Sequence, residues 1–392
     1  REATNMRALI LGCGEMAQAA IVDLVTQGVF QRLTIASRRP ERAEGFLATL
    51  PPHRVRLETA AIDVLDPPAL VRLMKGHDVV CNLAGPNYQN AVAIARAAIA
   101  ASVPLVDVTD DWVATLELLE LDADAKRAGI PIIIGLGASP GITNVMARYG
   151  ANQLDHVEEV RTSWIMRGSD MGGLALSKHL LYNNAHRAFV FRNGTMDEVR
   201  PFIDGAEVID YPVLGPVEVR HIGHPEPFTL SRFIPGIRYA DDKATFLPVE
   251  VNAMIAELGR VARSGHPVEV EGVPIDPMEF AANFLHQACA RLVDVPQTGA
   301  LRTEVRGERD GRSVRLVYAA AGRITIGTGV PASIGAMMLA IRKVATPGVH
   351  PPEACIDPEW FMAAIDQRHL GEIEETVHDW DRDPPPEVGD AT

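Results

Sequence analysis

An α/β fold is predicted for this chain of 392 residues: a doubly wound parallel sheet, followed by a second α+β domain that contains a mixed sheet. Three observations predict it. Short apolar runs alternate with helix-like segments through the first third of the chain, which is typical of a parallel sheet covered on both faces. A glycine-rich turn joins the first apolar run to the first helix. Beyond residue 137 the strands lengthen and hairpin signals appear, which indicates antiparallel pairing.

The elements of the first part follow in regular order. Strands are expected at residues 8–11, 33–36, 55–57, 78–83, 104–108 and 131–135. Helices are expected between them, at residues 19–25, 40–50, 67–75, 90–101 and 112–128. The glycine- and proline-rich turn at residues 137–144 starts a further helix at 143–153, and we place the domain boundary at this turn.

The second part mixes helices with hairpins. Helices are predicted at residues 174–184, 249–263, 278–292 and 331–343, and hairpins at Asn193-Gly194 and Asp310-Gly311. The predicted organisation is a nucleotide-binding domain at 6–137, a substrate-binding and dimerisation domain at 138–329, a helical return to the first domain at 330–375, and a disordered tail at 376–392. The tail is expected because the last residues are acidic and contain three consecutive prolines.

Composition narrows the function classes. The formal charge of -14 argues against a nucleic-acid partner, which requires a basic face. No apolar stretch reaches the roughly 20 residues that span a bilayer, so no membrane partner is expected. The four cysteines are far apart and form no C-x-x-C pair, which favours the reducing cytoplasm and argues against structural zinc. We therefore expect a cytoplasmic enzyme-like protein with no bound metal.

The glycine-rich turn has the G-x-G-x-x-A form of a dinucleotide-binding fingerprint. Gly12 permits the turn, Gly14 lets the backbone approach a pyrophosphate, and Ala17 keeps helix and strand close. The free N–H groups and the dipole at the start of the helix then stabilise the phosphate charge. The first domain is accordingly expected to be of the Rossmann type.

The end of the second strand indicates which dinucleotide binds. An NAD site usually has Asp or Glu about 20 residues after the glycines. Here Ser37, Arg38 and Arg39 occupy that place, and guanidinium groups pair with a 2′-phosphate that a carboxylate would repel. The predicted cofactor is NADP(H). Residues of the loop and of neighbouring strand ends are expected to bind it, namely Gly12, Gly14, Glu15, Met16, Ala17, Ser37, Arg38, Arg39, Asp63, Val64, Ala84, Gly85 and Pro86.

With these residues in view, the chain resembles the saccharopine dehydrogenase-like family of NAD(P)-dependent oxidoreductases, which includes saccharopine reductases, lysine 6-dehydrogenases and carboxynorspermidine dehydrogenases. The order and spacing of several segments carry the resemblance: residues 12–17, 63–64, 78–82, 106–108, 135–144, 223–227 and 348–353. It implies hydride transfer at a carbon–nitrogen bond, in which an imine is reduced to an amine or the reverse occurs. It also implies a homodimer formed through the second domain.

The resemblance also implies a cleft between the two domains. Residues that would contact the substrate there are Asn87, Asp110, Ser139, Gly141 and Asn144. Backbone N–H groups at the start of the helix that follows residue 141 could hold a substrate carboxylate. The groups expected to take part in catalysis are His224, Glu226 and Asp107.

One position departs from the family pattern. In saccharopine reductases the stretch corresponding to residues 224–226 carries an arginine that binds a substrate carboxylate. Here Glu226 has the opposite charge, so a cationic amine is expected to fit better than a glutamate moiety with two carboxylates. Saccharopine is therefore not the first choice of substrate.

Several patterns have a simpler interpretation beside the functional one. His221 and His224 spell H-x-x-H, but Gly223 and Pro225 interrupt any helix that could present them to a metal. His224 with Glu226 is either a proton-handling pair or a loop in which backbone carbonyls bind the imidazole. Asp110-Asp111 is most simply the N-cap of the next helix, with substrate contact as the alternative.

Two further patterns are assigned no function. Lys178-His179 is interpreted as part of a solvated helix face, with reach into the cleft as the alternative. Tyr239 and Lys243 have the Y-x-x-x-K spacing of short-chain dehydrogenases but lie outside the nucleotide-binding domain, so the match is interpreted as coincidence.

The leading hypothesis is an NADP(H)-dependent oxidoreductase acting on a C–N bond of an amino-acid or polyamine-type substrate, with a small-molecule amine or imine as partner. The first alternative is an NADPH-dependent reductase of a carbonyl or other non-amine compound, because a fold does not fix a substrate. The second is a non-catalytic NADP-binding sensor.

Overall fold

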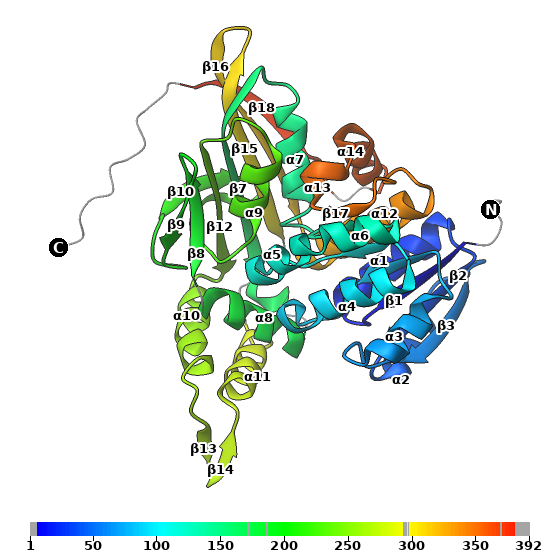
Figure 1. Ribbon diagram of the computed structural model, residues 1–392. Coiled ribbons are helices and arrows are strands. Elements are labelled where there is room, and N and C mark those ends of the chain that lie inside the picture. Colours follow the sequence, from blue (N-terminus) through cyan, green and yellow to red (C-terminus); the bar gives the residue numbers. More distant parts are fainter. Residues whose placement is uncertain are drawn as a thin grey trace.

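The computed structural model describes residues 6–170, 173–185, 187–292, 296, 298–368 and 371–380. Within them, the first domain is built on a seven-stranded parallel sheet of spatial order β17-β6-β5-β4-β1-β2-β3 (Figure 1). β1 pairs with β2 on one side and with β4 on the other, so the strand order reverses beside β1. Dinucleotides bind at this switch point in doubly wound sheets. The strands are β1 (Arg7–Leu11), β2 (Arg32–Ser37), β3 (Arg56–Ala61), β4 (Val79–Asn82), β5 (Leu105–Asp107), β6 (Pro131–Ile133) and β17 (Gly348–His350).

Side chains alternate between the two faces of this sheet, and helices cover both. Leu9 and Val80 point to the face covered by helices α3 and α4, whereas Ile10 and Cys81 point to the face covered by α1 and α12. The helices of this domain are α1 (Glu15–Gln27), α2 (Pro40–Leu47), α3 (Pro67–Met74), α4 (Asn87–Ala101), α5 (Trp112–Glu120) and α6 (Asp122–Ala128). The single helix predicted at 112–128 is thus two, separated at Leu121.

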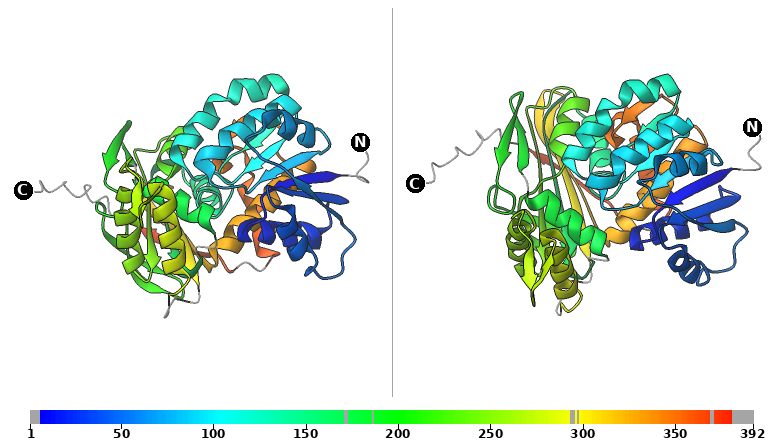
Figure 2. Two further views of the ribbon diagram at one scale, coloured as in Figure 1. Left: turned by 90° about the horizontal axis from the view of Figure 1, so that it is seen from below. Right: turned by 60° about the horizontal axis from the view of Figure 1, so that its bottom comes forward.

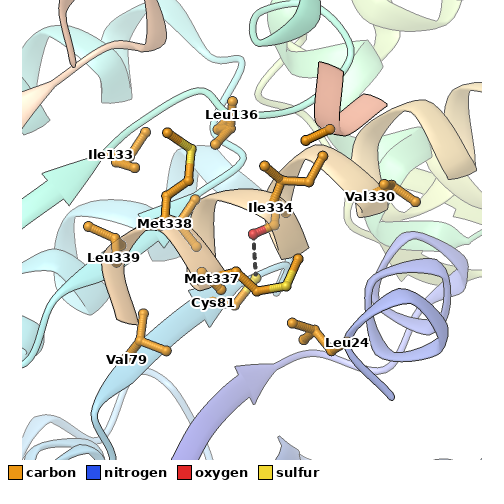
Figure 3. Packing of buried hydrophobic residues seen from close by; sticks show 14 of the residues in the cluster. Leu24, Val79, Cys81, Ile133, Leu136, Val330, Ile334, Met337, Met338 and Leu339 are labelled. Atoms are coloured by element: carbon orange, nitrogen blue, oxygen red, sulfur yellow. Dashed lines mark hydrogen bonds between the residues drawn. The ribbon is translucent and has the colours of Figure 1, made fainter. Parts of the chain in front are cut away.

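A helix from late in the chain completes the first domain. α12 (Ile324–Ala340) packs against α1, and its Val330, Ile334 and Met337 meet Leu24 and Cys81 in the core (Figure 3). The Cys81 thiol donates to the backbone carbonyl of Ala332 at 3.7 Å. The helix begins seven residues before the predicted start at 331. The prediction was late because it took Pro331 as the first residue, whereas this proline lies inside the first half of the helix. The helices α13 (Pro352–Cys355) and α14 (Pro358–Asp366) follow β17.

The second domain is built on a mixed sheet, as predicted. β7 and β12 pair in parallel, whereas β15 pairs in an antiparallel manner with both β7 and β16. The hairpins at Asn193-Gly194 and Asp310-Gly311 are confirmed, and all four residues have positive φ. The strands are β7 (His156–Arg167), β8 (Ala188–Arg192), β9 (Thr195–Val199), β10 (Glu207–Tyr211), β11 (Gly215–His221), β12 (Tyr239–Leu247), β15 (Gly299–Arg309), β16 (Arg312–Gly322) and β18 (Glu374–Asp379).

Helices cover one face of this sheet and form an arm beside it. α7 (Ile142–Ala151) and α9 (Glu226–Phe233) pack on the sheet face that contains Val160 and Val305. α8 (Leu174–Ala185) packs on the pair α10 (Glu250–Ala262) and α11 (Pro277–Cys289), which projects from the body of the molecule and ends in the hairpin β13 (Val268–Val270) and β14 (Val273–Ile275) (Figures 1 and 2). This arrangement leaves α8 between the arm and the first domain.

The predicted disordered tail begins too early. Residues 374–379 form β18, which pairs with β16 through a six-residue register, so residues 376–379 of the predicted tail are ordered. All six side chains of β18 are exposed, and backbone hydrogen bonding to an available sheet edge therefore accounts for the strand. Residues 381–392 lie outside the described residues. Among the helices that the structure describes, none is both long and apolar enough to cross a bilayer.

Candidate active site

A cavity of about 170 Å³ lies between the two domains. The first domain supplies the glycine loop, the segment after β4 and the segment after β5. The second domain supplies β7, α8 and the loop before α9, and the start of α12 closes the wall. Predicted site residues on this wall are Gly14, Glu15, Met16, Ala17, Gly85, Pro86, Asn87, Asp110, Ser139 and His224.

The glycine loop has the geometry that a dinucleotide requires. Gly12 has φ +104° and lies so close to β4 that a Cβ would come within 2.7 Å of the Leu83 carbonyl oxygen. Gly14 precedes α1, and a Cβ built on it meets nothing within 4 Å. The first turn of α1 therefore opens toward the cavity, where its N–H groups can receive a pyrophosphate.

The end of β2 fits a phosphorylated ribose. The Ser37 hydroxyl is buried without a hydrogen-bond partner among the described residues, while Arg38 and Arg39 are exposed. A 2′-phosphate would supply the acceptor that Ser37 lacks and would pair with the guanidinium groups. Arg42, on the first turns of α2, was not predicted. Burial raises the pKa of the Cys13 thiol and the Arg42 guanidinium opposes this, so Arg42 lies near the same loop.

Seven predicted cofactor residues are not on the cavity wall: Gly12, Ser37, Arg38 and Arg39, described above, and Asp63, Val64 and Ala84. Asp63 accepts a hydrogen bond from the Leu65 backbone at 3.0 Å and shapes the loop after β3. Val64 packs on the core beneath that loop. The Ala84 backbone is bound to the side chains of Asn82 and Asn90, which fixes the loop that presents Gly85 and Pro86 to the cavity.

His224 lies between two carboxyl groups. Its Nδ1 is 3.4 Å from Glu226, the first residue of α9, and 3.4 Å from Oδ2 of Asp242 on β12. Burial lowers the pKa of His224, but Glu226 and Asp242 outweigh this effect and raise it to about 9. At neutral pH the imidazole is therefore a cation that faces the cavity.

The surrounding residues hold this cluster in place. Ser139 donates to Glu226 at 2.6 Å, Thr162 donates to Asp242 at 2.7 Å, and Trp164 donates through Nε1 to Asp242 at 3.1 Å. Burial and the neighbouring Glu226 raise the pKa of Asp242. One nitrogen and two carboxylate oxygens of the cluster lie within 4.8 Å of one another, a spacing that could also hold a metal ion. That the chain binds no metal stays a prediction.

Asp107 is not among the residues that line the cavity, and its catalytic role stays a prediction. It is fully buried, and it accepts hydrogen bonds from Asn82 at 2.6 Å and from the backbone N–H of Thr109 at 2.7 Å, as well as from the Thr109 hydroxyl. These bonds shape the turn after β5. The turn brings Asp110, three residues later, onto the cavity wall, while Asp111 caps α5 through the Ala114 backbone.

Gly141 and Asn144 are also buried behind the wall rather than on it. The Asn144 side chain accepts from the Gly141 backbone N–H at 3.3 Å and donates to Glu353 at 3.0 Å. Both residues therefore anchor the start of α7 and the loop that carries Ser139. Of the substrate-binding candidates, the structure brings Asn87, Asp110 and Ser139 together.

Comparison with known proteins agrees with this geometry. The saccharopine dehydrogenase NADP-binding domain family matches residues 8–133. The match covers the first domain of the chain. The predicted cofactor, NADP(H), is the one for which the matched domain is named.

Two curated proteins resemble this chain over both domains. It is 23% identical over 391 residues to carboxyaminopropylagmatine dehydrogenase of Synechocystis sp., covering 93% of this chain and 96% of that one. It is 25% identical over 380 residues to carboxynorspermidine synthase of Vibrio cholerae, covering 86% and 89%. Its fold matches saccharopine dehydrogenase (L-Glu forming) of Saccharomyces cerevisiae with a TM-score of 0.69 at 14% identity, covering 95% and 100%.

The site includes residues that were not among the predicted site residues. His179, interpreted as part of a solvated face, is 4% exposed and lines the cavity beside Asp110. A signal was present, because Leu176, Leu180 and Asn183 lie on the same helix face at spacings of three and four residues. Trp164 lies on β7 and Asp242 on β12, and no local sequence pattern indicates which elements pack against these strands.

Of the two patterns that were set aside, Y-x-x-x-K lies away from the cavity, and H-x-x-H has only His224 on the cavity wall. Tyr239 and Lys243 lie on strand β12 rather than on a helix, and both contact Asp241. His221 also lies near Asp241, at 3.7 Å, so the two histidines of the H-x-x-H pattern contact different carboxyl groups.

Proposed function

We propose that this protein is an NADP(H)-dependent oxidoreductase that transfers a hydride between the cofactor and the carbon of an imine or amine C–N bond. The cavity chemistry carries the proposal. Its wall joins the glycine loop to the His224–Glu226–Asp242 cluster, and the described residues that line it include Asp110 and Glu15 but no arginine or lysine. Such a wall favours a cationic amine over a substrate with several carboxylates.

The relatives support an amine substrate of the amino-acid or polyamine type. Carboxynorspermidine synthase and carboxyaminopropylagmatine dehydrogenase are named for carboxylated amines, and each resembles this chain across both domains. Glu226, where saccharopine reductases carry an arginine, agrees with this choice, because a carboxyl group in that place does not attract a substrate carboxylate. Saccharopine remains a less favoured substrate.

The residues of the chain handle the substrate and its protons. NADP(H), when bound, supplies or accepts the hydride. His224, held protonated by its two carboxyl neighbours, donates a proton to the amine nitrogen as the product forms and accepts it in the reverse direction. The side-chain oxygen atoms of Asn87 and Asp110 can accept hydrogen bonds from N–H groups of the substrate. Leu83, Trp164 and Met166 supply apolar wall that excludes water.

The test is a matrix of amines paired with aldehydes and keto acids, in which NADPH oxidation is followed at saturating cofactor, with the reverse reaction run on the corresponding secondary amines. Turnover that requires both an amine and a carbonyl compound supports the proposal. Turnover with a carbonyl compound alone would favour the carbonyl reductase. Tight NADPH binding without turnover on any pair would favour the sensor.

We propose a homodimer in the cytoplasm as the working form. Four large apolar residues are exposed along the projecting arm: Val249, Val270, Val273 and Phe284. Exposed apolar residues that gather on one part of a surface often mark an interface. The cysteines are unpaired thiols, which agrees with a reducing compartment. Light scattering after gel filtration tests the dimer, and Val273→Lys with Phe284→Lys should yield monomers if the arm forms the interface.

A further inference from the structure

Helix α12 begins on the cavity wall with backbone N–H groups that the fold leaves unused. Ile324 and Thr325, its first two residues, both line the cavity. The first backbone hydrogen bond of the helix runs from the N–H of Gly327 to the carbonyl of Arg323 at 2.8 Å. Among the described residues, the N–H groups of residues 324–326 have no acceptor, and the Arg323 side chain does not cap them. The positive end of the α12 dipole therefore lies at the cavity without a partner.

Two hydroxyl groups lie beside these N–H groups. Thr325 and Thr328 are three residues apart on one face of α12, and both line the cavity. They are only 6% and 8% exposed. Within the part of the chain that the structure describes, neither hydroxyl has a hydrogen-bond partner, and neither oxygen is sealed from the cavity. Because buried hydroxyl groups are normally hydrogen-bonded, this pair indicates a place for a ligand.

The start of α7, where a substrate carboxylate was expected, is less available. The N–H groups of Ile142 and Thr143 in its first turn donate to the backbone carbonyls of Gly137 and Ala138, at 2.9 and 3.2 Å. These groups are used inside the protein. The start of α12 is therefore better suited to receive a carboxylate.

The charges next to the start of α12 favour an anion. Asp170 lies on the wall, but Arg167 donates to its Oδ2 at 2.8 Å and Arg323 donates to its Oδ1 at 3.2 Å. Two guanidinium cations and one carboxylate leave a net positive charge, and Arg323 directly precedes the helix. The other charged side chains named on the wall, Asp110 and Glu15, are acidic. An anion is thus best stabilised at the α12 end of the cavity.

Asp110 lies toward the other end of the same wall. The wall follows α8 from Gly173, three residues after Asp170, to His179, whose Nε2 is 2.8 Å from Oδ1 of Asp110. Six residues of helix span about 9 Å. The two ends of the cavity are therefore separated by the length of several carbon–carbon bonds and differ in charge.

We infer that the start of α12, with the hydroxyl groups of Thr325 and Thr328, binds a carboxylate of the substrate, while Asp110 binds a remote ammonium group. The inference rests on the proposed function and narrows its substrate class to an aliphatic amine that carries a carboxylate several carbons away. Hydroxyl and N–H donors can satisfy both carboxylate oxygens without a guanidinium group on the wall. The reacting C–N bond then lies between the two ends.

Binding of ω-amino acids to the native protein in the presence of NADP⁺ tests the inference. The probes are the series from 4-aminobutanoate to 8-aminooctanoate, each compared with its carboxamide, which has the same shape without the negative charge. Calorimetry should show the acid binding about 100-fold more tightly than the amide at the best chain length. Equal affinities throughout the series, or no binding of any member, would overturn the inference.

Substitutions on α12 locate the site of this preference. Thr325→Val and Thr328→Val keep the side-chain shape, and each should lower the acid-to-amide affinity ratio by roughly tenfold, the effect of one lost hydrogen bond to a charged group. Thr325→Ser and Thr328→Ser keep the hydroxyl and should keep the ratio. Ile326→Ala is the matched control, because Ile326 lies in the same turn but lines a different cavity. An unchanged ratio in both valine variants contradicts the assignment.

The affinity for NADP⁺ in the same variants separates the substrate carboxylate from the carboxamide of the cofactor. Weaker NADP⁺ binding with an unchanged acid-to-amide ratio would assign the hydroxyl groups to the cofactor and overturn the inference. Asp110→Asn should weaken the acid and the amide alike and keep their ratio, because both carry the ammonium group. Thermal melting of each variant identifies any loss that comes from misfolding.

The outcomes also separate this inference from the proposed function. A native protein that prefers the acids but turns over no amine–carbonyl pair contradicts the proposed function and keeps the carboxylate site. A native protein that turns over such a pair without preferring any acid to its amide overturns only the carboxylate site.

Discussion

Ser139 donates a hydrogen bond of 2.6 Å to Glu226, and this contact joins the loop after β6 to the first turn of α9. Glu226 is fully buried, and its second oxygen has no hydrogen-bond partner among the described residues. The position of the His224 imidazole therefore depends on a carboxyl group that Ser139 orients. The path of the loop after β6 and the geometry of the proton donor depend on one contact.

Ser139→Ala should destabilise the protein and lower turnover together. Removing the donor leaves a buried carboxyl oxygen without its partner, a loss of about 1–3 kcal/mol in the free energy of unfolding. Urea denaturation measures it. Ser231→Ala is the control, because Ser231 lies on the same helix as Glu226 and its hydroxyl donates to the backbone carbonyls of Pro227 and Phe228. If both variants lose equal stability and Ser139→Ala keeps full turnover, the contact has no role in positioning His224.

The stability of the protein should fall between about pH 6.5 and pH 9. The folded state raises the pKa of His224 to about 9, so its stabilising proton is fully present below pH 6.5 and is lost as the pH rises through 9. The raised pKa of Asp242 acts in the same direction, because the folded state again holds a proton more tightly than the unfolded state. The change is on the order of 1–3 kcal/mol.

Chemical denaturation at a series of pH values measures this dependence. His224→Gln removes the titrating ring and should flatten the curve between pH 6.5 and pH 9. A curve of unchanged slope in this variant would show that other groups control the alkaline loss of stability.

The double variant Ser37→Asp, Arg38→Ile should exchange the cofactor preference. A carboxylate at the end of β2 repels the 2′-phosphate and accepts hydrogen bonds from ribose hydroxyls, so NADPH should bind at least about tenfold more weakly and NADH more tightly. Calorimetric titration with both cofactors measures the change. Arg32→Ala, at the opposite end of the same strand, should leave the preference unaltered. An equal ratio in native and double-variant proteins would refute the assignment of the phosphate site.

Gly329→Ala should lower stability and weaken NADPH binding. A Cβ at Gly329 would lie 2.2 Å from the Met16 carbonyl oxygen in the first turn of α1, so α12 and α1 would have to separate. Overpacking of this kind costs about 1–3 kcal/mol, and here it displaces the helix that receives the pyrophosphate. Thermal melting and NADPH titration measure both effects.

Gly327→Ala is the matched control on the same helix. A Cβ there meets only the Cβ of Ala138 at 3.5 Å, an ordinary contact, so alanine should be neutral or stabilising by up to about 1 kcal/mol. Equal behaviour of the two variants would mean that α12 does not restrain α1.

The fold of the first domain could be predicted because its strands are short, apolar and separated by helices of ordinary length. What local pattern could not supply was the partner of each element. α12 has Pro331 in its first half, where proline usually marks a start, so its true beginning at Ile324 was missed. β18 has only exposed side chains, so its sequence shows no alternation of buried and exposed residues. It forms a strand by pairing with the edge of β16.

The candidate site divides in the same way. The cofactor loop and the His224–Glu226 pair are local in sequence and were predicted. Whether Asp107 or Asp110 lies on the cavity wall depends on the turn after β5, in which the backbone N–H and the hydroxyl of Thr109 donate to Asp107. Sequence periodicity does not predict such a turn. His179 reaches the cavity wall and Asp242 reaches His224 only because of how α8 and β12, far apart along the chain, pack in the fold.

The late position of α12 has a consequence for biosynthesis. One side of the first sheet is covered partly by a helix made of residues 324–340, so that side stays incompletely covered until most of the chain has left the ribosome. The nucleotide-binding half is translated first, yet its assembly finishes only after the other half has been synthesised.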